Sequence, residues 1–110
     1  SNGATRGEAL QTGGDAAIQA QLACRGALGI EESRGKKTID CEVVNTGDSK
    51  LSFVYTIDWF DKHGNVLEPA ERVWTRVSLG AQDSRAVRAT APSLQAVAWC
   101  LRALRPDQVR

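Results

Sequence analysis

The single histidine of this sequence, His63, is the side chain best suited to proton transfer at neutral pH. A Ser/His/Asp or Cys/His catalytic site would have to be built around it. Its neighbours, Asp61-Lys62-His63-Gly64-Asn65, contain no nucleophile motif and are typical of a turn, with Gly64 suited to a positive φ. We therefore expect His63 to lie in a loop and to have no catalytic role.

Metal centres need several ligands at close spacing, and the sequence offers few. With one histidine and no methionine, it lacks the ligands of a blue-copper site. No two cysteines have the CxxC spacing of a zinc ribbon or a thioredoxin-like motif. A P-loop, an EF-hand loop and a GxGxxG motif are also missing. The sequence therefore predicts no metal site and no cofactor.

The three cysteines, Cys24, Cys41 and Cys100, allow at most one internal disulfide and leave one thiol. In an oxidising compartment, a pair such as Cys24–Cys41 or Cys41–Cys100 is expected. The alternative is that all three are buried as small hydrophobic residues. The sequence does not decide between these interpretations.

Paired carboxylates are the remaining source of acid–base chemistry, as in a glycosidase. The candidates are Glu31, Glu32, Asp58, Asp61, Glu68 and Glu71. A typical glycosidase needs a larger cleft than a domain of 110 residues offers. We interpret these carboxylates as solvated charges on turns and strand faces, and we expect a protein that is not an enzyme.

The aromatic residues are the best candidates for binding. Trp59 and Trp99 lie on apolar faces of expected strands and are predicted to belong to the core. Val54, Phe60 and Trp74 lie on the other face of their strands, where apolar and polar residues are mixed. If that face is open to water, the three would form an apolar partner patch. The alternatives are that loops or the N-terminal segment cover this patch, or that Trp74 stacks on a carbohydrate. In the carbohydrate case Arg72, Arg76 and Ser78 would flank the ring.

The elements that position these residues read as short strands separated by turns. The expected strands are 18–24, 38–45, 51–60, 66–67, 72–79, 84–91 and 95–104. An extension of the first strand toward Ile30 is left open, and a helix over 15–28 is the alternative to it. The inner faces are predicted to include Ile39, Cys41, Val43, Leu51, Phe53, Tyr55, Ile57, Trp59, Val73, Val77, Leu79, Val87, Ala89, Ala91, Val97, Trp99, Leu101 and Ala103. The loops are too short for crossover helices, so the pattern predicts an all-β fold, an antiparallel Ig-like β-sandwich of about seven strands.

Length and charge agree with a single small domain. We expect a flexible N-terminal segment over 1–15, one sandwich domain over 16–105 and a tail over 106–110. Ser1-Asn2 resembles a remnant of tag cleavage. The net charge is +1 and the basic residues are scattered, which argues against binding to nucleic acid or to an anionic membrane surface.

Residues 43–104 resemble the YcfL-like family of predicted bacterial periplasmic lipoproteins, which has no established biochemical function. The resemblance rests on Asn45-Thr46-Gly47, Leu51, Tyr55, Trp59-Phe60-Asp61, Gly64, Trp74, Leu79, Ala91-Pro92, Ala96-Val97, Trp99 and Leu101. Cys24 and Cys100 do not fit the family pattern. The resemblance implies an extracytoplasmic sandwich whose signal peptide has been removed and whose lipidated cysteine lies upstream of this sequence. It implies no catalytic residues.

The sequence therefore favours a non-enzymatic module of the cell envelope. Its expected partner is another envelope protein or a cell-wall component, and it would meet the membrane only through the N-terminal lipid anchor. The alternative is a carbohydrate-binding or small-ligand-binding sandwich that uses Trp74.

Overall fold

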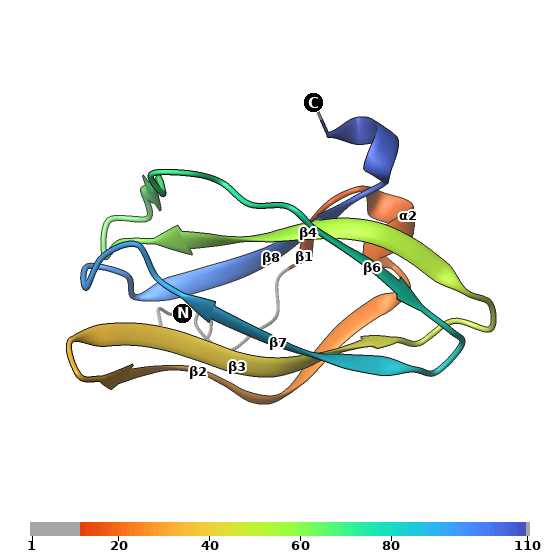
Figure 1. Ribbon diagram of the computed structural model, residues 1–110, viewed down its shortest axis with the longest axis horizontal. Helices are drawn as coiled ribbons and strands as arrows, with labels where there is room; N and C mark the ends of the chain where they lie inside the picture. Colours follow the sequence, from red (N-terminus) through yellow and green to blue (C-terminus); the bar gives the residue numbers. More distant parts are fainter. Residues whose placement is uncertain (1–11, 110) are drawn as a thin grey trace.

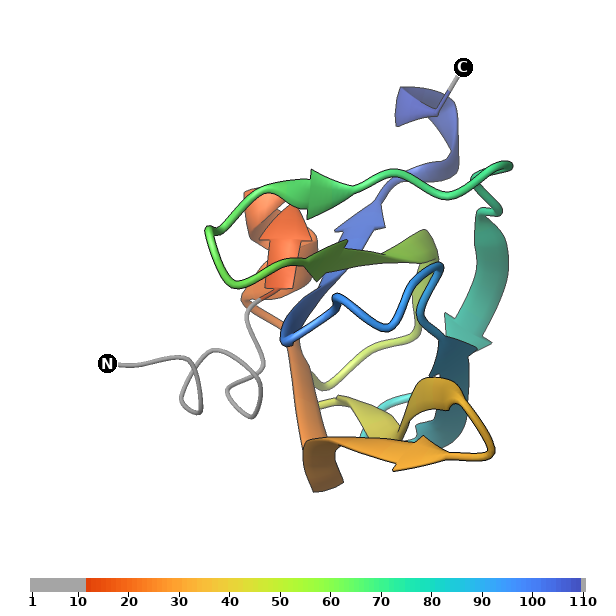
Figure 2. The same cartoon turned by 90° about the vertical axis from the view of Figure 1, so that its left-hand side faces the viewer.

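The computed structural model describes residues 12–109, which form two β-sheets packed face to face (Figure 1). The first sheet contains β1 (Thr12–Gly14), β4 (Leu51–Phe60), β5 (Val66–Leu67), β6 (Thr75–Leu79) and β8 (Ala98–Leu104). The second contains β2 (Leu22–Ser33), β3 (Lys36–Asn45) and β7 (Ser84–Thr90). One helical turn, α2 (Ala16–Gln19), and a 3-10 turn over Pro106–Gln108 complete the described chain. Figure 2 shows the same two layers from the side.

β4 organises the first sheet, and β3 the second. β4 pairs with β8 along one edge, and with β6 and then β5 along the other. β3 lies between β2 and β7. These pairs are antiparallel, whereas β1 runs parallel to β8. The expected β-sandwich is confirmed, and within residues 12–109 it has eight strands because the short β1 precedes the strands that alternation predicts.

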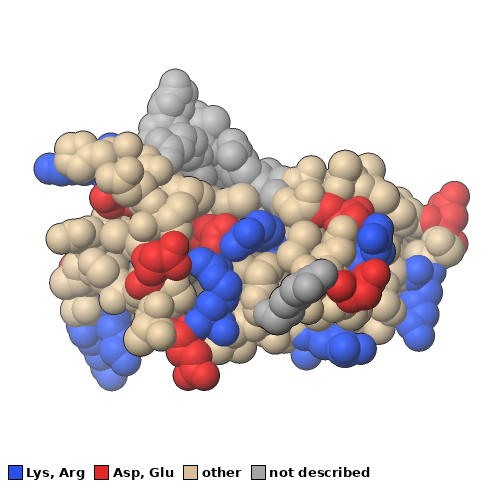
Figure 3. All heavy atoms as spheres, turned by 90° about the horizontal axis from the view of Figure 1, so that it is seen from above, with Lys and Arg blue, Asp and Glu red and all other residues tan. Residues whose placement is uncertain are grey.

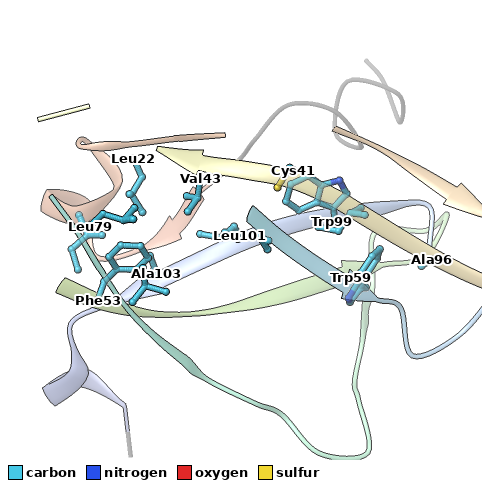
Figure 4. Close-up of a cluster of buried hydrophobic side chains, with 14 residues drawn as sticks. Leu22, Cys41, Val43, Phe53, Trp59, Leu79, Ala96, Trp99, Leu101 and Ala103 are labelled. Atoms are coloured by element: carbon cyan, nitrogen blue, oxygen red, sulfur yellow. The ribbon is translucent and has the colours of Figure 1, made fainter. Parts of the chain in front are cut away.

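The core lies between the two sheets, where the predicted alternation places it. Ile39, Cys41 and Val43 of β3 face inward and are almost fully buried. Phe53 and Trp59 of β4 belong to the same buried cluster as Trp99 and Leu101 of β8, and Trp59 pairs with Trp99 in the ladder (Figure 4). The buried indole N–H of Trp99 donates to the Leu28 carbonyl oxygen of the opposite sheet at 2.9 Å. Trp59 and Trp99 are therefore core residues, as the sequence predicts.

The prediction of a strand over 18–24 is wrong for residues 18–21, which precede the observed strand. Asp15 Oδ1 accepts the N–H groups of Ala17 and Ile18 at 2.9 and 3.1 Å, which caps the helical turn α2. These bonds, that from Ile18 above all, lower the pKa of the Asp15 carboxyl. The strand begins only at Leu22, so the alternative helix has the right start but ends after one turn.

Two predicted core residues, Val73 and Val97, are exposed. Val73 is 65% exposed and Val97 is 41% exposed, because β6 begins at Thr75 and β8 begins at Ala98. Each valine continues the alternating pattern of its strand into a preceding loop. Alternation in the sequence therefore extends beyond the paired part of both strands.

Both ends of the described chain form regular secondary structure. Residues 1–11 of the expected flexible segment lie outside the described residues, and Thr12–Gly14 pair with β8. Gly14 has a φ of +98°, and an added Cβ would collide with the Ala103 carbonyl oxygen, so this close approach requires glycine. Within residues 12–109, no helix has the length and apolar character needed to cross a membrane.

Candidate functional site

The β4 edge that faces β5 and β6 has a gap in its hydrogen-bonded ladder. β6 pairs with Leu51 through Tyr55, and β5 pairs only with Trp59 and Phe60. Among the residues that the structure describes, no strand pairs with residues 56–58 on that edge. The intervening segment 68–74 contains Pro69, which has no N–H to give to a ladder, and it passes the gap as a loop.

Ile57 points its backbone N–H and C=O into this gap. The N–H of Asp61 donates to the Asn65 carbonyl oxygen at 2.9 Å, so the backbone groups of Asp61 point toward the β5 side of β4. Backbone groups alternate between the two edges of a strand, so Trp59 and Ile57 point to the same side as Asp61. Trp59 meets β5 there, whereas Ile57 has no backbone partner on that side within residues 12–109. The strand therefore offers one unpaired donor and one unpaired acceptor.

A cleft of about 530 Å³ lies beside this gap, and we call it the edge cleft. Its floor comes from β4, one wall from the 68–74 loop and the other wall from the end of β7. The lining residues are Tyr55, Thr56, Ile57, Trp59, Pro69, Ala70, Glu71, Arg72, Val73, Thr75, Arg88, Ala89, Thr90 and Pro92. The volume lies within the range of about 300–1,000 Å³ that is usual for ligand pockets.

An ion pair fastens the 68–74 loop to β4 in place of ladder hydrogen bonds. Arg72 Nη1 donates to Asp58 Oδ1 at 2.7 Å, and the Asp58 side chain is only 12% exposed. Arg72 also lies 3.4 Å from Glu68 within the loop. Asp58 Oδ2 is 3.2 Å from Arg102 Nε, although the two groups lack hydrogen-bond alignment. One carboxylate thus lies within ion-pair distance of two guanidinium groups on the outer face of the sheet.

Trp74 packs against this ion-pair cluster. The Arg102 guanidinium lies 5.5 Å from the centre of the Trp74 ring, within cation–π range. Figure 3 views the outer face of the sheet that contains β4 and β8, and it shows acidic and basic groups intermixed, with no large area of one sign. One face of the Trp74 ring is therefore already occupied by a protein cation.

The predicted patch of Val54, Phe60 and Trp74 is not one continuous apolar surface. Val54 is 6% exposed, and Phe60 and Trp74 are half-buried. Val54 and Phe60 are six residues apart on β4, about 20 Å at strand spacing. Thr56 and Asp58 lie between them on the same face, and Asp58 carries the ion pairs with Arg72 and Arg102.

Two of the three cysteines lie on neighbouring strands of one sheet, and the third lies on the other sheet. Cys24 of β2 and Cys41 of β3 are thiols whose sulfurs are 3.9 Å apart. The hydrogen bond between the two thiols, together with burial, raises the pKa of Cys24, and the same contact lowers the pKa of Cys41. Cys100 lies on β8 in the other sheet, paired with Asp58. The predicted disulfide thus stays a prediction, with one of its candidate pairs in contact.

His63 is exposed in the turn between β4 and β5, as expected. Asp61 Oδ1 accepts the backbone N–H groups of His63 and Asn65, each at 2.9 Å, and these bonds, that from Asn65 first, lower the pKa of Asp61. Within the described residues, no cluster of three His, Cys, Asp or Glu side chains is arranged to hold a metal ion.

Asn45 is a structural residue that the sequence suggests only as part of a turn. It is fully buried, and its Nδ2 donates to the carbonyl oxygens of Ser49, Leu79 and Gly80 at 2.9, 3.1 and 3.1 Å. Its Oδ1 accepts the Gly47 N–H at 2.9 Å. This one amide joins the β3–β4 turn to the β6–β7 turn at the end of the sandwich.

Two solved structures resemble this fold. One is a DUF1425 family member from Shewanella sp. pv-4, with a TM-score of 0.63 and 17% identity over 74% of this chain and 75% of that chain. The other is Campylobacter jejuni cj0090, also with a TM-score of 0.63 and 17% identity, over 86% of this chain and 97% of that chain. At this identity the likeness supports the fold alone. No curated protein matches the chain.

A family model described as "Protein of unknown function (DUF1425)" matches residues 14–103. This range contains all of β2 to β7 and nearly all of β8, together with the edge cleft and the Asn45 hydrogen bonds. The protein therefore belongs to the DUF1425 family.

Proposed function

We propose that this chain is the folded part of a lipid-anchored periplasmic protein of the YcfL-like kind, and that it binds another envelope protein rather than catalysing a reaction. The compartment is supported by the resemblance over residues 43–104. The intact mass of the full-length protein, extracted from bacterial membranes, tests the anchor. Acyl chains on a cysteine upstream of this sequence would support it, and an unmodified protein in the cytosolic fraction would contradict it.

The observation that carries the binding function is the open edge of β4 beside the edge cleft. An extended polypeptide segment binds an open strand edge by exchanging backbone hydrogen bonds with it. Ile57 offers one N–H and one C=O for that exchange. The flanking strands β5 and β6 limit the contact to a few residues of the partner.

The cleft would supply selectivity for an apolar side chain on that segment. Tyr55, Pro69 and Ala89 provide apolar surface in the lining. At its rim, Glu71 and Arg88 are exposed charges of opposite sign, so no net field selects a strongly charged segment. The partner that best fits is an extended, weakly charged segment of an envelope protein with an apolar anchor residue.

A linear peptide library tests the proposed location. Peptides selected on the immobilised domain should bind Ala70→Trp at least about tenfold more weakly, because the exposed Ala70 lines the cleft and an indole there obstructs it. The matched control is Ala81→Trp, which adds the same indole at an exposed turn outside the cleft lining. Unchanged melting temperatures would show that both variants fold.

Two results would contradict peptide binding at the edge cleft. In the first, the selected peptides as a class bind both variants and the parent equally, which would place their site elsewhere. Alternatively, muropeptides or oligosaccharides would raise the melting temperature of Ala70→Trp but not of Trp74→Ala. That result would favour the carbohydrate alternative, with the sugar on Trp74.

A further inference from the structure

Cys24 and Cys41 are diagonal neighbours on the inner face of two antiparallel strands. Cys24 pairs with Val43 in the ladder, and Cys41 pairs with Gly26, so the two cysteines point to the same side of the sheet. Their sulfurs are 3.9 Å apart. Cys41 is buried and Cys24 is half-buried, so the pair lies at the border of the core.

We propose that Cys24 and Cys41 are an oxidation site, which a disulfide oxidant converts to an intramolecular disulfide while Cys100 keeps its thiol. A disulfide has an S–S length of about 2.05 Å, so the two sulfurs have to approach by about 2 Å. The strand that carries Cys24 is built to allow this movement. β2 is an edge strand, Gly26 has a φ of +98°, and the register of β2 shifts between Ala27 and Glu31.

The reaction is a thiol–disulfide exchange in two steps. One of the two thiols loses its proton to solvent and attacks one sulfur of the oxidant disulfide, which releases one thiolate. The other thiol then loses its proton and attacks the cysteine sulfur of the mixed disulfide, which releases the second thiolate. The two cysteines lose two electrons and two protons, and the oxidant becomes two thiols.

The fold keeps Cys100 apart from this reaction. Cys100 belongs to the other sheet, and it lies between Trp99 and Leu101, whose side chains fill the core. Side chains alternate along a strand, so Cys100 points to the outer face, where its ladder neighbour is Asp58. The Cys41–Cys100 pair would need a sulfur to pass through the sheet.

Peptide mapping tests this assignment, because trypsin places the three cysteines on separate peptides, 7–25, 38–50 and 89–102. The folded protein is incubated with oxidised glutathione, denatured, and alkylated with N-ethylmaleimide. We expect peptides 7–25 and 38–50 to be joined with a loss of about 2 Da, and peptide 89–102 to carry the maleimide.

Variants separate the proposal from general oxidation. Cys100→Ser should form the same joined peptide, whereas Cys24→Ser should not form it. The same incubation in denaturant confirms that the oxidant is active, because there all three cysteines can react. A joined peptide that contains 89–102 from the folded protein, or maleimide on all three peptides after oxidation, would overturn the proposal.

Discussion

Asn45→Asp should lower the free energy of unfolding by more than about 3 kcal/mol, the largest effect expected of any substitution considered for this domain. The buried Nδ2 group donates to three carbonyl oxygens. A carboxylate in its place would lose those hydrogen bonds and bring a negative charge against the same oxygens. Urea denaturation at neutral pH measures the change.

The amide-to-carboxylate change has a matched control at the surface. Gln95→Glu introduces the same chemistry at an exposed side chain and should change the free energy of unfolding by no more than about 0.5 kcal/mol. Since protonation removes the charge, Asn45→Asp should recover part of its stability at acidic pH. Equal stabilities for Asn45→Asp and Gln95→Glu would show that Asn45 does not hold the two turns together.

Asp58→Asn should lower the free energy of unfolding by about 2 kcal/mol, an intermediate value because the pair is neither fully buried nor on the open surface. The substitution keeps the side-chain shape but removes the charge that Arg72 and Arg102 share. Asp58 is 12% exposed, so water replaces the lost interaction poorly. The 68–74 loop should also become more accessible to limited proteolysis.

An exposed ion pair on the same protein provides the comparison. Asp40 pairs with Arg88 at 3.2 Å, but the two side chains are 60% and 82% exposed. Asp40→Asn should therefore change the free energy of unfolding by no more than about 0.5 kcal/mol. If Asp58→Asn lowers the free energy of unfolding by no more than Asp40→Asn does, the Asp58–Arg72 ion pair does not fasten the loop to β4.

Much of the sandwich follows from the sequence because its strands bury one face. Alternation over 51–60 predicts β4 with both its ends, and alternation over 38–45 predicts the inward residues of β3. Both tryptophans predicted for the core, Trp59 and Trp99, are buried. Hydrophobic burial on one face imposes a period of two residues, and that period is visible without a structure.

The first two elements of the described chain, β1 and α2, could not be predicted from alternation in the sequence. α2 is one turn long, and its main determinant is a single capping residue, Asp15. β1 contains two glycines and no apolar alternation, so only its parallel pairing with β8 identifies it as a strand. Elements this short depend on tertiary contacts rather than on local propensity.

The candidate site depends on a missing pairing, which a sequence pattern does not encode. Alternation identifies strands on both sides of the loop but does not reveal that residues 56–58 lack a partner on one edge. Pro69 was the available signal, since proline in a segment expected to pair argues for a loop or an edge. The Asp58–Arg72 and Arg102–Trp74 contacts require the register of three elements, so neither could be predicted.

The measurement that tests the binding account most directly is amide hydrogen exchange at Ile57, followed by NMR with and without a peptide selected on the domain. In the free protein, the Ile57 amide should exchange at least about tenfold faster than the amides of Tyr55 and Trp59, which point to the same side and have strand partners. Bound peptide should slow exchange at Ile57 by at least about tenfold. An Ile57 amide that is already as protected as its two neighbours, or that is unaffected by the peptide, would contradict an open, ligand-binding edge.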